Sequence, residues 1–196
     1  MLIGITGNIG SGKSTFSKFL KEALEKDEFK VNLINADKIG HLVLEKKEVK
    51  TTLIERWGER ILNKNTKTLN RKIIRDIVFK DIKEYKFLCS LVWPKIYEEI
   101  LKNIKDNFIN ILEAAVLIEA NWFKICNKII LVKSYFFKRF IRKPFLNFKE
   151  FKLINSFQYP EDTLETYANF IITNNSSLLK LKKQAILTSQ ILKNFL

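Results

Sequence analysis

The sequence predicts an α/β fold in which helices flank a five-stranded parallel sheet. Five short apolar runs, each bounded by polar residues, predict buried strands. Apolar residues recur at helical spacing between these runs, and strands that alternate with helices favour parallel pairing. A glycine-rich turn joins the first strand to the first helix. The five predicted strands cover residues 2–6, 31–34, 108–112, 128–132 and 170–173.

Helices are predicted where apolar residues form one-sided stripes. One stripe runs through Ile96 and Ile100 before the third strand, and another runs through Leu181 and Leu192 at the end of the chain. We therefore expect helices on the faces of the sheet, as in other folds of alternating strands and helices.

Two long intervals predict insertions into a single domain that spans residues 1–196. The interval of about 38–106 is too long for one crossover helix, so we expect an inserted helical region, with a helix break at Pro94. The interval of about 134–159 is the second expected insertion.

Composition excludes several classes of protein. The chain has 196 residues and is 46% hydrophobic, which indicates a globular protein rather than a disordered one. Its net charge of +14 favours anionic partners, but a bias toward Lys, Asn, Ile and Phe accounts for this charge equally well. The single histidine, His41, excludes a multi-histidine metal site, and Cys89 and Cys126 lie too far apart for metal-ligand spacing.

No targeting or membrane signal is expected from the sequence. The apolar start of the chain lacks a basic region, and no run of about 20 apolar residues is present. Two lone cysteines are typical of a reducing compartment. We therefore expect a cytoplasmic protein without a membrane partner.

Residues 7–15, GNIGSGKST, fit the phosphate-loop pattern G-x-x-x-x-G-K-[ST]. Glycines let backbone N–H groups turn toward phosphate oxygens, and the helix that follows directs its positive end at the same phosphates. Lys13 is expected to reach the β- and γ-phosphates of ATP, and Ser14 to bind Mg²⁺. The residues expected to bind nucleotide here are Gly7, Gly10, Ser11, Gly12, Lys13, Ser14 and Thr15.

The loop indicates a nucleotide, and the rest of the chain favours a small kinase. A GTPase would carry an Asn-Lys-x-Asp motif, but the two Asn-Lys stretches, at 63–66 and 127–130, lack the aspartate. The chain is also short for a motor ATPase. A small kinase that phosphorylates a small-molecule acceptor fits best.

Two acidic residues follow predicted strands at the sheet edge where the loop lies. Asp37 comes just after the second strand, where a carboxylate can accept a proton from an acceptor hydroxyl. The alternative for Asp37 is the N-cap of the next helix. Glu113 ends the third strand and is expected to support Mg²⁺, directly or through water; the alternative is a solvated turn residue. Glu119 follows in the next segment.

A basic cluster lies within the second insertion. Lys138, Arg139, Arg142 and Lys143 are spaced to share one face of a helix. Facing a phosphate site, they would neutralise charge on the transferred phosphoryl group; facing water, they would form a solvated surface. The phosphate loop favours the first alternative for at least one arginine.

These residues together resemble the dephospho-CoA kinase family over nearly the whole chain. The resemblance is strongest at 3–15 and continues at 34–42, where it implies that Asp37 is the catalytic carboxylate. It matches Arg139 to the first lid arginine and either Arg142 or Lys143 to the second. It also places Asn174 in a strand near the adenine.

The resemblance implies an activity and a fold. A P-loop kinase core, a CoA-side helical region and a lid would transfer the γ-phosphate of Mg-ATP to the ribose 3′-hydroxyl of dephospho-CoA, the last step of coenzyme A biosynthesis. Lys13, Arg139 and Asp37 would be the catalytic residues, with Arg142 and Asn174 among the nucleotide-binding ones.

The chain departs from the family pattern at several positions. Asn8 replaces a glycine at a variable loop position, and Asn35 replaces an acid before Asp37. Trp93 stands where the family has a histidine, and Phe136 replaces a lid glutamine. The open alternatives are another small-molecule or nucleotide kinase, and an ATP-binding protein that has lost catalysis. A nucleic-acid partner is not expected, because only the charge favours one.

Overall fold

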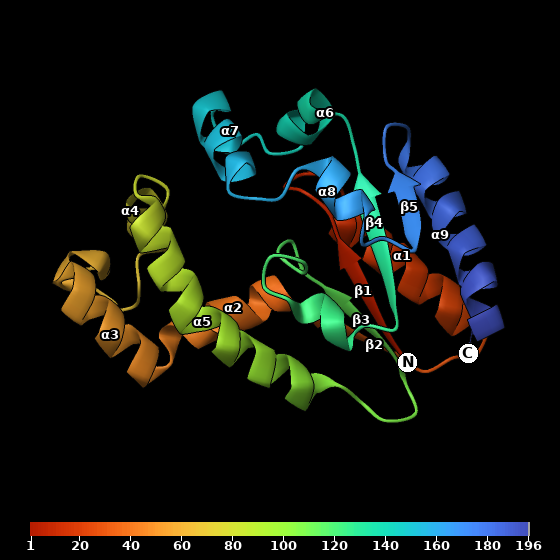
Figure 1. Cartoon of the computed structure of the whole chain (residues 1–196), viewed down its shortest axis with the longest axis horizontal. Helices are drawn as coiled ribbons and strands as arrows, with labels where there is room; N and C mark the ends of the chain where they lie inside the picture. The colour runs from red at the N-terminus through yellow and green to blue at the C-terminus, as the bar shows by residue number, and fades with distance from the viewer. Residues whose placement is uncertain (196) are drawn as a thin grey trace. The chain divides into compact units, whose positions relative to one another are not determined.

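The computed structural model describes residues 1–195, which form two compact units (Figure 1). The core unit joins Met1–Asn35 to Asn103–Leu196, and the helical unit is Ala36–Lys102. The chain thus leaves the core unit directly after its second strand and re-enters it shortly before the third.

The core unit contains a sheet whose five strands, in spatial order β2-β3-β1-β4-β5, all pair in parallel. This confirms the predicted fold class. Parallel strands need crossover connections, and the alternation of strands and helices in the sequence provides them. The strands are β1 (Leu2–Thr6), β2 (Val31–Asn35), β3 (Ile109–Glu113), β4 (Lys128–Lys133) and β5 (Phe170–Thr173).

The register aligns the carboxyl ends of the central strands. Glu113, the last residue of β3, pairs with Ile5 of β1 on one side and with Asn35 of β2 on the other. The loop that follows β1 and the polar residue that ends β3 therefore share one edge of the sheet, which is where parallel sheets bind ligands.

Helices α1 (Lys13–Lys26) and α9 (Leu178–Leu192) pack against each other and against the sheet (Figure 1). Phe16, Leu20 and Leu24 of α1 recur every four residues and are fully buried. They meet Leu181 and Leu192 of α9 in one apolar cluster with the central strands. Burial of each such side chain contributes about 1.5–3 kcal/mol, so this cluster fixes the position at which α1 begins.

The remaining core-unit elements lie between β3 and β5 and after α9. They are η2 (Trp122–Ile125), α6 (Phe136–Ile141), α7 (Phe148–Ser156), α8 (Glu161–Glu165) and η3 (Lys193–Phe195).

Helices α6 and α7 are joined by phenylalanine rings. Phe136 of α6 packs edge-on against Phe148 and Phe151 of α7, with ring centroids 6.0 and 5.2 Å apart. Phe140 contacts the same two rings at 5.5 Å each. The departure at Phe136 therefore has a packing role, because its ring holds the two helices of this segment together.

The helical unit consists of α2 (Ala36–Glu45), α3 (Lys47–Trp57), η1 (Glu59–Ile61), α4 (Arg71–Val78) and α5 (Ile82–Asn103). The predicted helix break at Pro94 is wrong, because α5 continues through it. Pro94 removes one backbone hydrogen bond, but Val92 and Ile96 on either side are buried, and their packing outweighs that loss.

Within the described part of the chain, no helix combines the length and apolarity that a membrane crossing requires.

Candidate phosphate-binding site

The glycine-rich loop lies between the end of β1 and the first residue of α1. Gly10 has φ of 77° and Gly12 has φ of 98°, a region that L-residues with side chains rarely occupy. A Cβ at Gly10 would collide with the carbonyl oxygen of Arg139, and one at Gly12 would collide with the side-chain amide of Asn174. These glycines are therefore required both by the turn and by the close approach of its neighbours.

Lys13, the first residue of α1, turns its side chain back over the loop. Its Nζ donates hydrogen bonds to the carbonyl oxygens of Gly7, at 2.7 Å, and of Asn8, at 3.3 Å. The side chain is buried, with 8% of its residue surface exposed. The ammonium thus lies against the loop together with the positive end of α1, an arrangement that attracts phosphate.

Ser14 and Glu113 bring hard oxygen atoms together beside the loop. The Ser14 hydroxyl donates a hydrogen bond to Glu113 Oε1, and the side-chain amide of Asn35 donates to Glu113 Oε2 at 3.1 Å. Glu113 is buried. A hydroxyl and a carboxylate are the kind of ligands that Mg²⁺ takes alongside substrate phosphates, so this pair fits the ion.

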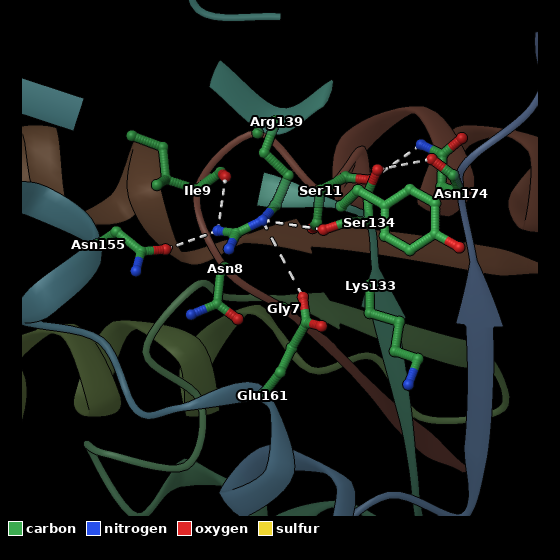
Figure 2. A network of polar contacts seen from close by, with 12 residues as sticks. Gly7, Asn8, Ile9, Ser11, Lys133, Ser134, Arg139, Asn155, Glu161 and Asn174 are labelled. Carbon is green, nitrogen blue, oxygen red and sulfur yellow. Dashed lines mark hydrogen bonds and ion pairs between the residues drawn. The ribbon is translucent and has the colours of Figure 1, made fainter. Parts of the chain in front are cut away.

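Arg139 of α6 extends its guanidinium to the loop, where Figure 2 shows it beside Ile9. Its Nη1 donates to the carbonyl of Ile9 at 3.4 Å and to Asn155 Oδ1 at 2.6 Å, while Nε donates to the carbonyl of Ser134 at 3.0 Å. Burial lowers the pKa of this guanidinium, and Glu161, 4.0 Å away, opposes that change. Arginine remains charged under such a change, because its ordinary pKa exceeds 12.

Arg142 also contacts the loop, through two backbone carbonyls. Its Nη1 donates to Gly10 at 3.2 Å and to Ser11 at 3.3 Å, and its Nη2 donates to the carbonyl of Asn174 at 2.8 Å. Burial lowers the pKa of Arg142. Asn174 itself donates from its side chain to the carbonyl of Ser11 at 2.8 Å. Arg142 and Asn174 thus contact the loop from the segments that follow β4 and β5.

The expectation that the four basic residues share one helical face is wrong. Helix α6 ends at Ile141, so Arg142 is its C-cap and Lys143 lies beyond it. Arg139 is buried against the loop, whereas Lys138 is exposed and donates to the carbonyl of Asn175 at 2.5 Å. The short helix sends the two arginines to the loop and the two lysines elsewhere.

Three buried oxygens at the loop have no hydrogen-bond partner among the described residues. They belong to the side chains of Thr6, Asn8 and Ser11. Buried polar atoms are nearly always satisfied by protein, water or ligand. Their gathering on six consecutive residues indicates a site that a polar ligand and its waters complete.

Asp37 belongs to the helical unit, where it is an exposed residue in the first turn of α2. The N-cap alternative is wrong, because the helix already begins at Ala36. Burial, then Arg71, lowers the pKa of His41, and Asp37 opposes them. His41 therefore lies within electrostatic reach of Asp37 and of Arg71. Neither His41 nor Arg71 was expected as a site residue, since 34 residues separate Asp37 from Arg71 in the chain.

Comparison with known proteins identifies relatives across the whole chain. The dephospho-CoA kinase family model matches residues 1–180. A dephospho-CoA kinase of Dehalococcoides mccartyi is 32% identical over 189 residues, with 92% of each chain covered. One from Fusobacterium nucleatum is 35% identical over 190 residues, with 94% of each covered. The solved structure of a dephospho-CoA kinase from Campylobacter jejuni superposes with a TM-score of 0.69 at 26% identity, covering 100% of this chain and 98% of that one.

Proposed function

The chain belongs to the dephospho-CoA kinase family of ATP-dependent phosphotransferases, and we propose that it transfers the γ-phosphate of ATP to the ribose 3′-hydroxyl of dephospho-CoA. One observation carries the proposal: Lys13, Arg139 and Arg142 all direct their cationic groups at backbone carbonyls of one glycine loop. Three convergent cations at a helix N-terminus suit the triphosphate of ATP.

The phosphates of ATP would lie in the loop 7–15. Its backbone N–H groups and the positive end of α1 would bind the phosphate oxygens. The Lys13 ammonium would exchange the neutral carbonyl acceptors of Gly7 and Asn8 for the anionic β- and γ-phosphates, which attract its charge more strongly. Asn174 and Arg142 would bind the nucleotide on the side of the loop that they already contact.

Ser14 and Glu113 would hold Mg²⁺, with Glu113 acting directly or through a water molecule. When bound, the ion would neutralise part of the negative charge of the phosphates.

Asp37 would accept the proton of the 3′-hydroxyl. The 3′-oxygen attacks the γ-phosphorus, the bond from that phosphorus to the β,γ-bridging oxygen breaks, and ADP leaves with the electron pair of that bond. His41, which interacts electrostatically with both Asp37 and Arg71, and Arg71 itself are candidates to bind the acceptor's phosphate groups. The helical unit, which carries all three residues, would bind dephospho-CoA.

The segment 134–159 would act as a lid. Arg139 and Arg142 would stabilise the charge that spreads over the transferred phosphoryl group, which is where arginine contributes most to such reactions. A closed lid would exclude water and so suppress ATP hydrolysis.

Product identification tests this proposal. The purified protein would be incubated with Mg-ATP and one acceptor at a time: dephospho-CoA, shikimate, adenosine 5′-phosphosulfate or a nucleoside monophosphate. We expect coenzyme A, one phosphoryl group heavier than dephospho-CoA by mass spectrometry. Phosphorylation of a different acceptor would overturn the assignment of the substrate but keep the kinase, and ATP binding without any product would overturn both.

A further inference from the structure

Asn8 occupies a loop position where the family pattern has glycine, and its side chain forms a hydrogen bond that glycine lacks. Only 3% of the residue surface is exposed. Its Nδ2 donates a hydrogen bond to the carbonyl of Tyr159 at 3.0 Å. The reversed amide would place Oδ1 against that carbonyl oxygen, so this bond fixes which way the side chain points. Glycine has no side chain with which to make this bond.

Tyr159 is held from a second side as well. Its backbone N–H donates to Glu119 Oε1 at 2.9 Å. The backbone N–H and C=O of Tyr159 are therefore both hydrogen-bonded to side chains from elsewhere in the core unit. The preceding residue adds to this, because Gln158 Oε1 accepts from the backbone N–H of Ile9 in the loop at 2.7 Å.

These hydrogen bonds lie at one end of a segment that carries two arginines of the site. Tyr159 ends the segment 134–159, which carries Arg139 and Arg142. At the other end, the Ser134 hydroxyl donates to the carbonyl of Asn174 at 2.7 Å. Because the segment is fixed at both ends, the position of Tyr159 on the loop sets how its two arginines approach the phosphates.

We propose that Asn8 and Glu119 form a clamp on the backbone of Tyr159, and that Asn8 is a positioning residue for bound ATP. The kinetic part of this proposal rests on the proposed function. With the clamp open, only a fraction of molecules hold both arginines at the loop, and the apparent affinity for ATP falls by that fraction. An unclamped segment also admits water, which diverts the γ-phosphate from the acceptor.

Amide hydrogen exchange tests the clamp without any turnover. Asn8→Ala removes the side-chain donor without adding backbone freedom, and Asn8→Gly supplies the family residue, which the loop accommodates. We expect both variants to speed exchange at the Tyr159 amide by about tenfold or more, a change of about 1.4 kcal/mol. Glu119→Ala should do the same, while Glu119→Gln, which keeps an acceptor oxygen, should restore slow exchange.

Asn127→Ala is the matched control. Asn127, directly before β4, also bonds a backbone group through its side chain, since its Oδ1 accepts from the N–H of Leu2, the first residue of β1, at 2.7 Å. This variant should leave exchange at Tyr159 unchanged. Unchanged exchange at Tyr159 in both Asn8 variants would overturn the clamp.

Steady-state kinetics tests the positioning role. Asn8→Ala should raise KM for ATP several-fold with a smaller effect on kcat, and should increase ADP release in the absence of acceptor. Faster exchange at Tyr159 with an unchanged KM and no added hydrolysis would overturn the positioning role. A wild-type protein that shows no turnover with dephospho-CoA would instead overturn the proposed function, and the exchange experiment would still decide on the clamp.

Discussion

The hydroxyl of Ser14, at the start of α1, donates a hydrogen bond to the carboxylate of Glu113, 99 residues later at the end of β3. This contact joins the phosphate loop to the neighbouring strand end. It places an oxygen pair of the kind that binds Mg²⁺ beside the expected phosphates.

Glu113→Gln should raise the Mg²⁺ concentration needed for half-maximal activity several-fold, because it removes the negative charge of the pair while keeping its shape. The measurement is activity against total Mg²⁺ at a fixed ATP concentration. Glu165→Gln is the control, since Glu165 pairs with Lys133 instead. Identical Mg²⁺ titrations for Glu113→Gln and wild type would exclude Glu113 from the metal site.

Arg139→Lys should lower both kcat and stability. Lysine cannot bond Ser134, Asn155 and Ile9 together in this geometry, so a buried acceptor loses its donor, at a cost of about 1–3 kcal/mol. We expect kcat to fall by about 10²–10³, the effect of losing one donor to the transition state. Urea unfolding measures the stability, and steady-state kinetics with dephospho-CoA as the acceptor measures kcat.

Lys138→Ala is the control for Arg139, because Lys138 is exposed on the same short helix. Its stability should stay within about 0.5 kcal/mol of wild type. A full kcat in Arg139→Lys would show that the guanidinium does not act on the transferred group.

Gly10→Ala should destabilise the protein and abolish tight ATP binding. The residue has φ of 77°, and a Cβ would collide with the carbonyl of Arg139. The conformation alone costs about 1–2 kcal/mol for an L-residue. Gly40→Ala, within α2, is the control. A Cβ there would lie 3.3 Å from Cδ1 of Ile96, the flexible end of that side chain, and alanine is about 1 kcal/mol better than glycine inside a helix, so the two effects oppose each other and stability should change little. Calorimetric titration with ATP measures the affinity of both variants. Equal affinities would contradict the close approach of Arg139 to Gly10.

Glu119→Gln should gain stability over wild type as pH rises. Burial raises the pKa of Glu119, against the opposing effects of the Tyr159 N–H and of Lys13. A carboxyl whose pKa is higher in the folded than in the unfolded protein contributes fully to the free energy of unfolding below the unfolded pKa, about 4.3. That contribution is lost as the pH rises through the folded-state pKa. The difference in unfolding free energy between the two proteins should therefore be small near pH 4 and grow toward neutral pH. A constant difference would contradict the burial of an ionised carboxylate.

The sequence predicted the sheet well because short apolar runs between polar residues are a local signal. The ends of all five strands lie within one residue of their predicted positions. The phosphate loop is also local, with its nine residues contiguous. The N-cap alternative for Asp37 failed because the exact first residue of a helix depends on backbone geometry that a preference for aspartate does not fix.

Long-range contacts account for what the sequence did not predict. The sequence predicts only a tolerated replacement at Asn8, because the partner of its side chain, Tyr159, lies 151 residues away. The spacing of the four basic residues predicted a shared face because it left out Pro144, which lies two residues after the C-cap Arg142 and favours the end of α6 at Ile141. Pro94 predicts a helix break from its local chemistry, but tertiary packing continues α5 through it.

Release of ADP from Mg-ATP, with and without dephospho-CoA, tests the central claim most directly when wild type is compared with Lys13→Ala and Asp37→Asn. The account predicts release that requires dephospho-CoA and is lost in both variants, because one loses the phosphate-binding ammonium and the other the proton acceptor. Release that proceeds equally without dephospho-CoA, or that survives in both variants, would contradict it.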